Sequence, residues 1–275
     1  MTVMKRALIK KCFWYMGKLL NFIWASFYLL VYFIFHPNQF KVFLFSIFSD
    51  INEFHQMAFG RLKNFEETKF FQQLSSHFIF AQSNLFNRDV KVTRSMETHF
   101  LSTLVKELNP EAIFEIGTYN GFTTLHLALN SSQSCRIFTL DLPPDYDAHK
   151  VQGSSYDDLL VIELSQKTIN QRFYKKHPLE DKITELYGDS AVFDFTNYYG
   201  KIDIVFIDGN HSLQYVKSDT ENAFKLLTEH GVIVWHDFDY IIHKDVFCYL
   251  NDLSKKHPIY SVAQTRFAIY GKNID

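Results

Sequence analysis

One stretch, Phe114–Thr124, constrains the fold of this chain more than any other. It completes an apolar run typical of a strand, turns at Gly117 and Gly121, and leads into a helix-like segment over 123–130. Glycine lacks a Cβ, so the backbone can bend sharply there and come close to a ligand. A strand, a glycine turn and a helix start is how an α/β protein holds a nucleotide-like ligand.

The acid in this stretch indicates the kind of ligand. The pattern is Glu-x-Gly-x-x-x-Gly from Glu115 onward, not the Gly-x-Gly-x-x-Gly that receives a pyrophosphate. A carboxylate repels phosphate and suits a ligand with positive charge. The stretch resembles the first motif of the class I S-adenosylmethionine (SAM) methyltransferases. The resemblance implies that the loop wraps the methionine part of SAM, using Glu115, Gly117, Thr118, Tyr119 and Gly121.

Two further acids follow in the order that this resemblance implies. Asp141 ends the strand-like run Arg136–Asp141 and lies 20 residues beyond Gly121, a spacing at which an acid meets ribose hydroxyls in doubly wound folds. The next strand-like run, 183–187, is followed by Gly188, Asp189 and Ser190. The resemblance implies that Asp189 and Ser190 lie at the adenine edge. Short Gly-Asp turns are common, so only their order supports this interpretation.

Short apolar runs alternate with helix-like segments along the rest of the chain, which predicts a parallel sheet. Residues 201–207 are almost all apolar, as in a strand buried on both faces. We expect Ser212 to cap a helix that His230 and Gly231 end. The other expected elements are a helix over 241–255 and strands over 232–235, 259–262 and 267–270, the last pair providing a reversed edge strand.

The predicted fold class is therefore α/β: a doubly wound, mostly parallel seven-stranded sheet with an N-terminal apolar helical appendage. This is the Rossmann-like layout of the class I methyltransferases, and the resemblance covers residues 90–272.

Asp208 and Asp237 end neighbouring strands of this predicted sheet. Two adjacent carboxylates repel each other unless a proton or a cation intervenes, and a divalent ion such as Mg²⁺ would also polarise a substrate hydroxyl. His211 shares the loop of Asp208, and its pKa near neutrality suits a general base. These residues resemble the metal-dependent, macrocin-type sugar O-methyltransferases. There, matching Asp residues bind magnesium, the matching His is the base, and the Asp208 loop also borders SAM.

His236 stands where some of these relatives carry an acid, so the metal and its ligand number stay open. The sequence predicts His236 as a third metal ligand, or as a hydrogen-bond partner of Asp237. Two other functions stay open as well. One is a tethered protein that binds SAM or a sugar without turnover. The other is a metal-dependent hydroxylase, because His211, His236 and Asp237 could imitate a two-His-one-carboxylate iron site.

The crossover from Leu142 to Asp181 is long and holds a helix-like segment over 156–175. Long loops at a ligand edge tend to be functional, so it is interpreted as a lid or substrate wall, or else as an ordinary crossover helix. Residues 93–96 would then close over SAM from the other side.

The first 49 residues contain six Lys/Arg and no acid, and residues 13–35 are almost wholly apolar and aromatic. A shallow membrane anchor with Lys/Arg on anionic headgroups is the preferred interpretation. It would keep the catalytic domain with intracellular SAM, on the cytoplasmic face of a membrane. A contact in a homo-oligomer, built from Phe-rich helices, is the alternative.

The expected domains are the appendage (1–49), a helical connector (50–89) and a SAM-dependent methyltransferase domain (90–275). Three scattered cysteines form no disulfide framework, which fits a reducing compartment. No basic catalytic surface indicates nucleic acid. We therefore expect a small-molecule, sugar or lipid-linked glycan acceptor.

Overall fold

The computed structural model describes residues 63–64, 95–151, 153–240, 242–263, 265–272 and 274. They belong to one compact unit, residues 52–275. The predicted anchor, most of the predicted connector and residues 93–94 lie outside the described residues. Among the helices that are described, none is long and apolar enough to cross a membrane.

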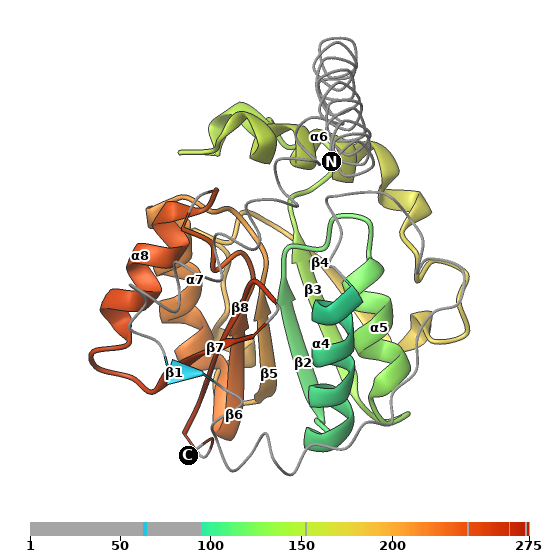
Figure 1. Cartoon of the computed structure of the whole chain (residues 1–275). Coiled ribbons are helices and arrows are strands. Elements are labelled where there is room, and N and C mark those ends of the chain that lie inside the picture. Colours follow the sequence, from blue (N-terminus) through green and yellow to red (C-terminus); the bar gives the residue numbers. More distant parts are fainter. Residues whose placement is uncertain are drawn as a thin grey trace, which may run out of the picture. The chain divides into compact units, whose positions relative to one another are not determined.

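The predicted α/β sheet is confirmed (Figure 1). Its order is β1-β7-β8-β6-β5-β2-β3-β4, and β2 to β6 run parallel to one another. Seven strands match the prediction, and a two-residue strand extends the sheet beside β7. The bounds are β1 Lys63–Asn64, β2 Ala112–Ile116, β3 Arg136–Asp141, β4 Ile183–Tyr187, β5 Ile202–Ile207, β6 Leu227–Trp235, β7 Ile259–Val262 and β8 Phe267–Gly271.

The reversed strand is not at the edge, as the sequence had indicated. β8 lies between β6 and β7 and is antiparallel to both. All five of its residues are buried, because it has a strand on each side and helices on both faces.

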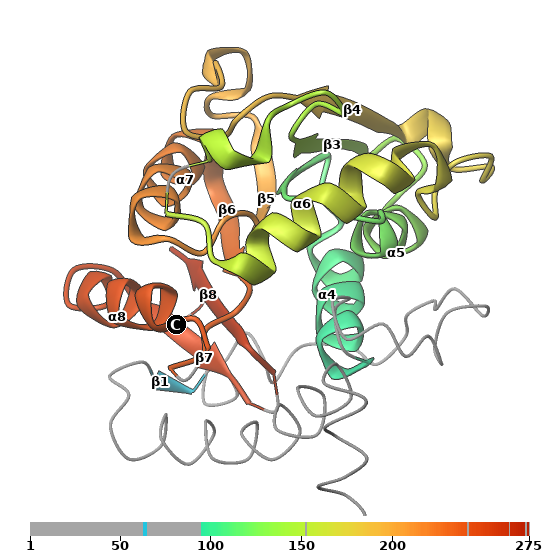
Figure 2. The same ribbon diagram turned by 90° about the horizontal axis from the view of Figure 1, so that it is seen from above.

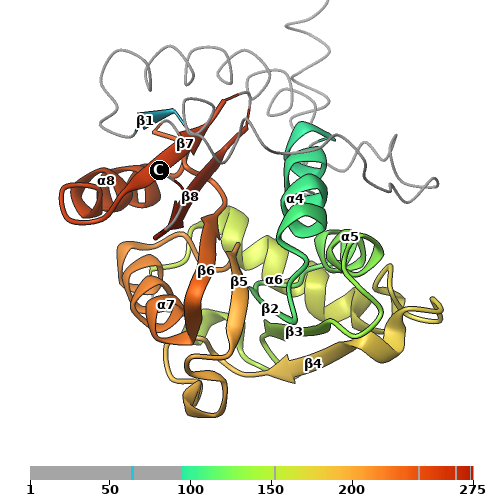
Figure 3. The same cartoon turned by 90° about the horizontal axis from the view of Figure 1, so that it is seen from below.

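Helices cover both faces of the sheet (Figure 3). The covering helices are α4 Ser95–Leu108, α5 Phe122–Asn130, α7 Leu213–Leu226 and α8 Lys244–Leu253, and a further helix, α6 Tyr156–Thr168, lies beyond the strand ends (Figure 1). α7 and α8 pack into one hydrophobic cluster, and α4 and α5 pack into the other. β2 is buried at every position because both of its faces are covered. The central strands are thereby fixed, and with them the residues at their ends.

The predicted end of α7 is wrong. The helix stops at Leu226, and His230 and Gly231 belong to β6. β6 begins early because Leu227 pairs with Ile202, and the register then shifts before Val232 pairs with Ile204. A Cβ on Gly231 would lie 2.9 Å from the Ile202 carbonyl oxygen, so this glycine permits a close approach to β5. α6 and α8 are also shorter than predicted.

Ser212 precedes α7 as predicted, but its side chain makes no capping hydrogen bond. The first backbone N–H of that helix, on Leu213, instead donates to Asp245 Oδ2 at 3.1 Å.

α6 lies across the carboxyl ends of the central strands (Figure 2). Its Ser165 hydroxyl is 2.7 Å from Asp141 Oδ2 and 3.3 Å from the Tyr119 carbonyl oxygen. At its other end, Asp158 contacts His211. The long crossover therefore covers the edge at which ligands bind in such sheets.

Candidate active site

The glycine loop after β2 is held by its packing against protein. Gly117 has a φ of +96°, and a Cβ there would lie 2.1 Å from the Asp208 carbonyl oxygen. Gly121 has a φ of +74°, and a Cβ there would lie 2.5 Å from the Tyr174 ring. The positive φ of both glycines fits the sharp turns that the sequence predicted, and a side chain at either position would meet protein atoms.

Glu115 lies beneath this loop and is fully buried. Its Oε2 accepts hydrogen bonds from the hydroxyls of Thr124 and Thr139, each at 2.6 Å. Thr118 completes the group through Thr139, at 2.6 Å. Burial raises the pKa of Glu115 to about 8, because the lost hydration outweighs the hydrogen bonds from Thr124 and Thr139 and the charge of Arg172. Glu115 is therefore mostly protonated at neutral pH. In this structure it stabilises the loop through its hydrogen bonds with Thr124 and Thr139.

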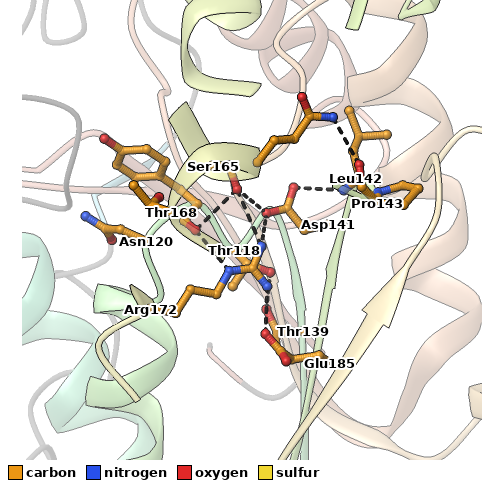
Figure 4. A network of polar contacts seen from close by, with 12 residues as sticks. Thr118, Asn120, Thr139, Asp141, Leu142, Pro143, Ser165, Thr168, Arg172 and Glu185 are labelled. Carbon is orange, nitrogen blue, oxygen red and sulfur yellow. Dashed lines mark hydrogen bonds and ion pairs between the residues drawn. The ribbon is translucent and has the colours of Figure 1, made fainter. Parts of the chain in front are cut away.

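Asp141 ends β3 and carries a dense set of contacts (Figure 4). Its Oδ2 accepts from Arg172 Nη2 at 2.6 Å and from the Ser165 hydroxyl at 2.7 Å. Its Oδ1 accepts from the Leu142 N–H at 2.8 Å. The predicted ribose acid is thus at the predicted place, with Arg172 as a partner that the sequence analysis missed.

Asp189 is bound by two tyrosines. The hydroxyls of Tyr146 and Tyr215 donate to its Oδ2 at 3.0 and 2.9 Å, and the Ala191 N–H donates to its Oδ1. The neighbouring Ser190 interacts with Asp219, a carboxyl on α7 whose pKa burial raises to about 7.

Asp208 and Asp237 come together as predicted, with His236 between them. His236 Nδ1 is 2.9 Å from Asp208 Oδ1 and 3.2 Å from Asp237 Oδ2. Although burial alone would lower it, the charges of Asp208, Asp237 and Glu97 raise the pKa of His236 well above its usual value. Arg266, from the turn before β8, contacts Asp237 Oδ1. Much of the repulsion between the two acids is therefore offset by protein cations.

His211 bridges two carboxylates. Its Nδ1 lies 2.7 Å from Asp158 Oδ1, and its Nε2 lies 2.8 Å from Asp237 Oδ2, close enough for an ion pair but poorly directed for a hydrogen bond. Against the effect of burial, Asp158 and Asp237 raise the pKa of His211 to about 10. The His243 ring lies against it with centroids 4.1 Å apart and the ring planes tilted by 45°, and burial lowers the pKa of His243 to about 4.

Among the described residues, two sets of three side chains could each hold a metal ion, because the ligand atoms within each set lie within 4.8 Å of one another. One set is Asp208, His236 and Asp237, which the sequence analysis predicted. The other is His211, Asp237 and His243. Both sets use Asp237, so a single ion could be held by one of them at a time.

Comparison with known proteins bears on what such a site does. A family model described as a methyltransferase domain matches residues 114–238, and an O-methyltransferase family model matches residues 66–154. A protein of Arabidopsis thaliana assigned by name as a caffeoyl-CoA O-methyltransferase is 28% identical over 171 residues, 62% of this chain and 63% of that protein. Catechol O-methyltransferase B of Danio rerio is 44% identical over 46 residues, 17% of each chain.

Residues 114–238 form a methyltransferase domain. A caffeoyl-CoA O-methyltransferase 1 of Dictyostelium discoideum is also similar, at 25% identity over 56% of this chain and 59% of its own. Each of these alignments covers less than two thirds of the relative's length. Among solved structures, the SAH-bound methyltransferase PaMTH1 of Podospora anserina has a TM-score of 0.49 and 16% identity, covering 66% of this chain and 81% of that one.

The candidate site also contains residues that the sequence analysis missed. Glu97 at the start of α4 is fully buried and lies 3.3 Å from His236 and 3.4 Å from Arg266. Asp158 had one usable signal, because Ser155 and Asp158 form a capping box at the start of α6. Nothing in the sequence marked Arg172, Arg266 or His243.

Proposed function

We propose that this protein transfers the methyl group of SAM to a hydroxyl oxygen of a small molecule, a sugar or a lipid-linked glycan. The observation that carries the proposal is the placement of His211. This imidazole is oriented by Asp158 and lies beside the Asp208–His236–Asp237 group, at the strand edge that also holds the glycine loop and Asp141. A base, an acid pair and a SAM loop on one edge are the parts that O-methylation needs.

His211 is the proposed general base. As the new O–CH₃ bond forms and the S–CH₃ bond breaks, the acceptor hydroxyl releases its proton to Nε2 of His211, and SAM leaves as S-adenosylhomocysteine (SAH). Asp158 accepts from Nδ1 at 2.7 Å, so it fixes the ring orientation and stabilises the imidazolium that forms.

The two acids on His211 limit this role. With a pKa of about 10, His211 is protonated at neutral pH and cannot take up a proton. A positive charge that offsets Asp237 would lower that pKa and free the base.

A divalent cation, with Mg²⁺ as the expected ion, would supply this charge and would also polarise the acceptor hydroxyl. Asp208, His236 and Asp237 would hold it, and the spacing of their ligand atoms fits such an ion. His236 would have to give up its proton, and Asp237 would have to share its charge with Arg266. These two changes make cation binding dependent on pH.

The second set of ligand atoms supports a second candidate. With His211 and His243 as ligands beside Asp237, the site would be of the two-His-one-carboxylate type found in iron oxygenases. His211 Nε2 would then be a ligand and could not be the base. Activity with SAM and Mg²⁺ supports methyl transfer, and activity that needs Fe²⁺ and oxygen supports the hydroxylase. Binding of SAM without any turnover supports the non-catalytic alternative.

His211→Ala tests the proposal directly. Turnover at saturating acceptor should fall by ~10²–10⁴-fold, the usual contribution of a general base, while the Kd for SAM is unchanged. His230→Ala is the matched control, since His230 is exposed on β6, away from the group around Asp237. If His211→Ala keeps full turnover and His243→Ala loses it, the base is His243 and this assignment is wrong.

The location of the protein is part of the proposal. We expect residues 1–49 to attach it to the cytoplasmic face of a membrane, because they combine six Lys/Arg with a long aromatic, apolar run. Deleting 1–49 should release the protein from liposomes that contain anionic lipids and leave SAM binding intact. If the full-length protein does not bind these liposomes, and the deletion instead breaks an oligomer, the segment is a subunit contact.

A further inference from the structure

Arg172 is buried at the centre of the polar network on the ligand edge (Figure 4). It follows α6 and is only 2% exposed. Its Nη2 donates to Asp141 at 2.6 Å, its Nη1 donates to Glu185 at 2.9 Å, and its Nε donates to the Tyr119 carbonyl oxygen at 3.2 Å. One guanidinium therefore joins the end of β3, the middle of β4 and the glycine loop.

Arg172 favours the charged form of Asp141. Burial raises the pKa of Asp141 above its usual value, and the charge of Arg172 is the largest influence that lowers it. An ionised carboxylate accepts hydrogen bonds at both oxygens, whereas a protonated one presents a donor on one side. Two ribose hydroxyls need acceptors, so removing the cation would weaken their recognition.

The geometry also requires arginine in particular. A planar fork reaches two carboxylates and a carbonyl group in fixed directions, which the single ammonium of lysine cannot do. The link to the Tyr119 carbonyl matters because Tyr119 has a φ of +49°, an uncommon conformation for a non-glycine residue. Arg172 thus sets the position of the ribose acid relative to the loop that meets the methionine part of the ligand.

We propose that Arg172 is a positioning residue for SAM, which holds Asp141 in place to meet the ribose hydroxyls. The inference rests on the proposed function, since it takes Asp141 as the residue that binds the ribose. It goes beyond that function by assigning affinity for SAM to a buried side chain that touches neither the methyl group nor the acceptor. The Ser165 hydroxyl, the other donor to Asp141 Oδ2, is neutral and can give way to a ribose hydroxyl.

The test is a pairwise comparison of ligands and variants in the full-length protein. Calorimetry would give the Kd of SAH and of its 2′-deoxyribose analogue for wild type, Arg172→Met and Arg172→Lys. Hydrogen bonds to a charged group are worth enough that Arg172→Met should weaken SAH binding by ~10- to 100-fold. The same substitution should weaken binding of the analogue much less, because the analogue lacks one of the hydroxyls that Asp141 recognises. At saturating SAM, kcat should stay within about threefold of wild type while the KM for SAM rises.

Arg172→Lys keeps the charge and loses the fork, so it should recover part of the affinity for SAH. If Arg172→Met does not fold, the affinities of Arg172→Lys for SAH and for the analogue provide the same comparison. Ser165→Ala is the matched control, because it removes the neutral donor from the same carboxylate oxygen, and it should leave SAH affinity within about twofold of wild type or improve it.

Three results would overturn the inference. If Arg172→Met loses affinity for SAH and for the analogue equally, Arg172 is a structural residue only. Tighter SAH binding in Arg172→Met would mean that the Arg172–Asp141 contact competes with SAM and must break before SAM binds. A wild-type protein that binds SAH and the analogue equally would show that Asp141 does not recognise the ribose. Failure of the wild type to bind SAH at all would instead refute the proposed function.

Discussion

Glu115→Gln probes the buried acid beneath the glycine loop. Burial raises the pKa of Glu115 from 4.5 to about 8, so the folded protein binds a proton that the unfolded chain has released above pH 4.5. Glutamine resembles the protonated acid in shape and keeps an oxygen for the hydroxyls of Thr124 and Thr139. The variant should therefore remove the titration and keep the packing.

The sign follows from proton linkage. Because the folded-state pKa is the higher one, the contribution of Glu115 to stability is fully present below pH 4.5 and is lost as the pH rises towards 8. Each pH unit in this window lowers the free energy of unfolding of the wild type by about 1.4 kcal/mol. The pKa shift of about 3.5 units corresponds to roughly 5 kcal/mol in all. Glu115→Gln should not show this loss.

Urea unfolding of the protein at pH 5, 6, 7 and 8 measures the difference. The stability of wild type should fall relative to that of Glu115→Gln by ~1.4 kcal/mol per pH unit, and other buried acids such as Asp219 cancel in the comparison. Glu163→Gln is the control, because Glu163 is exposed on α6 and should give a line parallel to wild type. If the stabilities of Glu115→Gln and wild type change with pH in parallel, Glu115 is ionised in the folded protein and the reasoning from burial is refuted.

Three further experiments test other parts of the site. Gly117→Ala should prevent folding or cost several kcal/mol more than Gly200→Ala, since both residues have positive φ but only a Cβ on Gly117 meets the Asp208 backbone; urea unfolding measures both. Asp158→Asn should lower the pKa of His211, so the acidic limb of the pH–rate profile should move to lower pH, and kcat should fall as the ring loses its orientation. Treatment with a chelator should abolish turnover until a divalent cation is restored, and calorimetry should find weaker cation binding to Asp237→Asn; full turnover after chelation would exclude the metal.

The sequence predicted the strands well where local pattern decides them. β3 and β4 begin and end where expected, and β5 begins one residue later. Each is a short apolar or alternating run with a polar residue at its end, and such runs have few other ways to be buried. The end of α7 was missed because pairing between β5 and β6 decides it. Gly231 looked like a helix stop, yet it is a point of close contact between two strands.

The site was predictable to the extent that topology determines it. In a parallel sheet all strand ends meet at one edge, so Asp141, Asp208 and Asp237 could be assigned to a common site from the order of the strands. Their partners could not. Arg266 contacts Glu97, 169 residues away, and Arg172 contacts Asp141 from a crossover whose path no local rule fixes. Such contacts depend on tertiary structure, and a single sequence carries no periodic signal for them.

The protein cations beside Asp237 change how the acid pair should be understood. The sequence argument was that two adjacent carboxylates need a proton or a divalent ion between them. In the structure His236 lies between them, and Arg266 holds the pKa of Asp237 well below its usual range. The acid pair is thus stable as it stands, and its repulsion alone no longer requires a metal.

The proposed role of a metal then depends on His211. Asp158 and Asp237 together hold this imidazole in its charged form, in which it cannot act as a base. Asp158 must keep its contact with His211, because it orients the ring and also forms the capping box of α6 with Ser155. The charge that has to be offset is therefore that of Asp237, and a cation bound there would do so at the point where the acceptor hydroxyl must lose its proton. A metal bound in this site would therefore act by releasing the base, and would not be needed to separate the two acids.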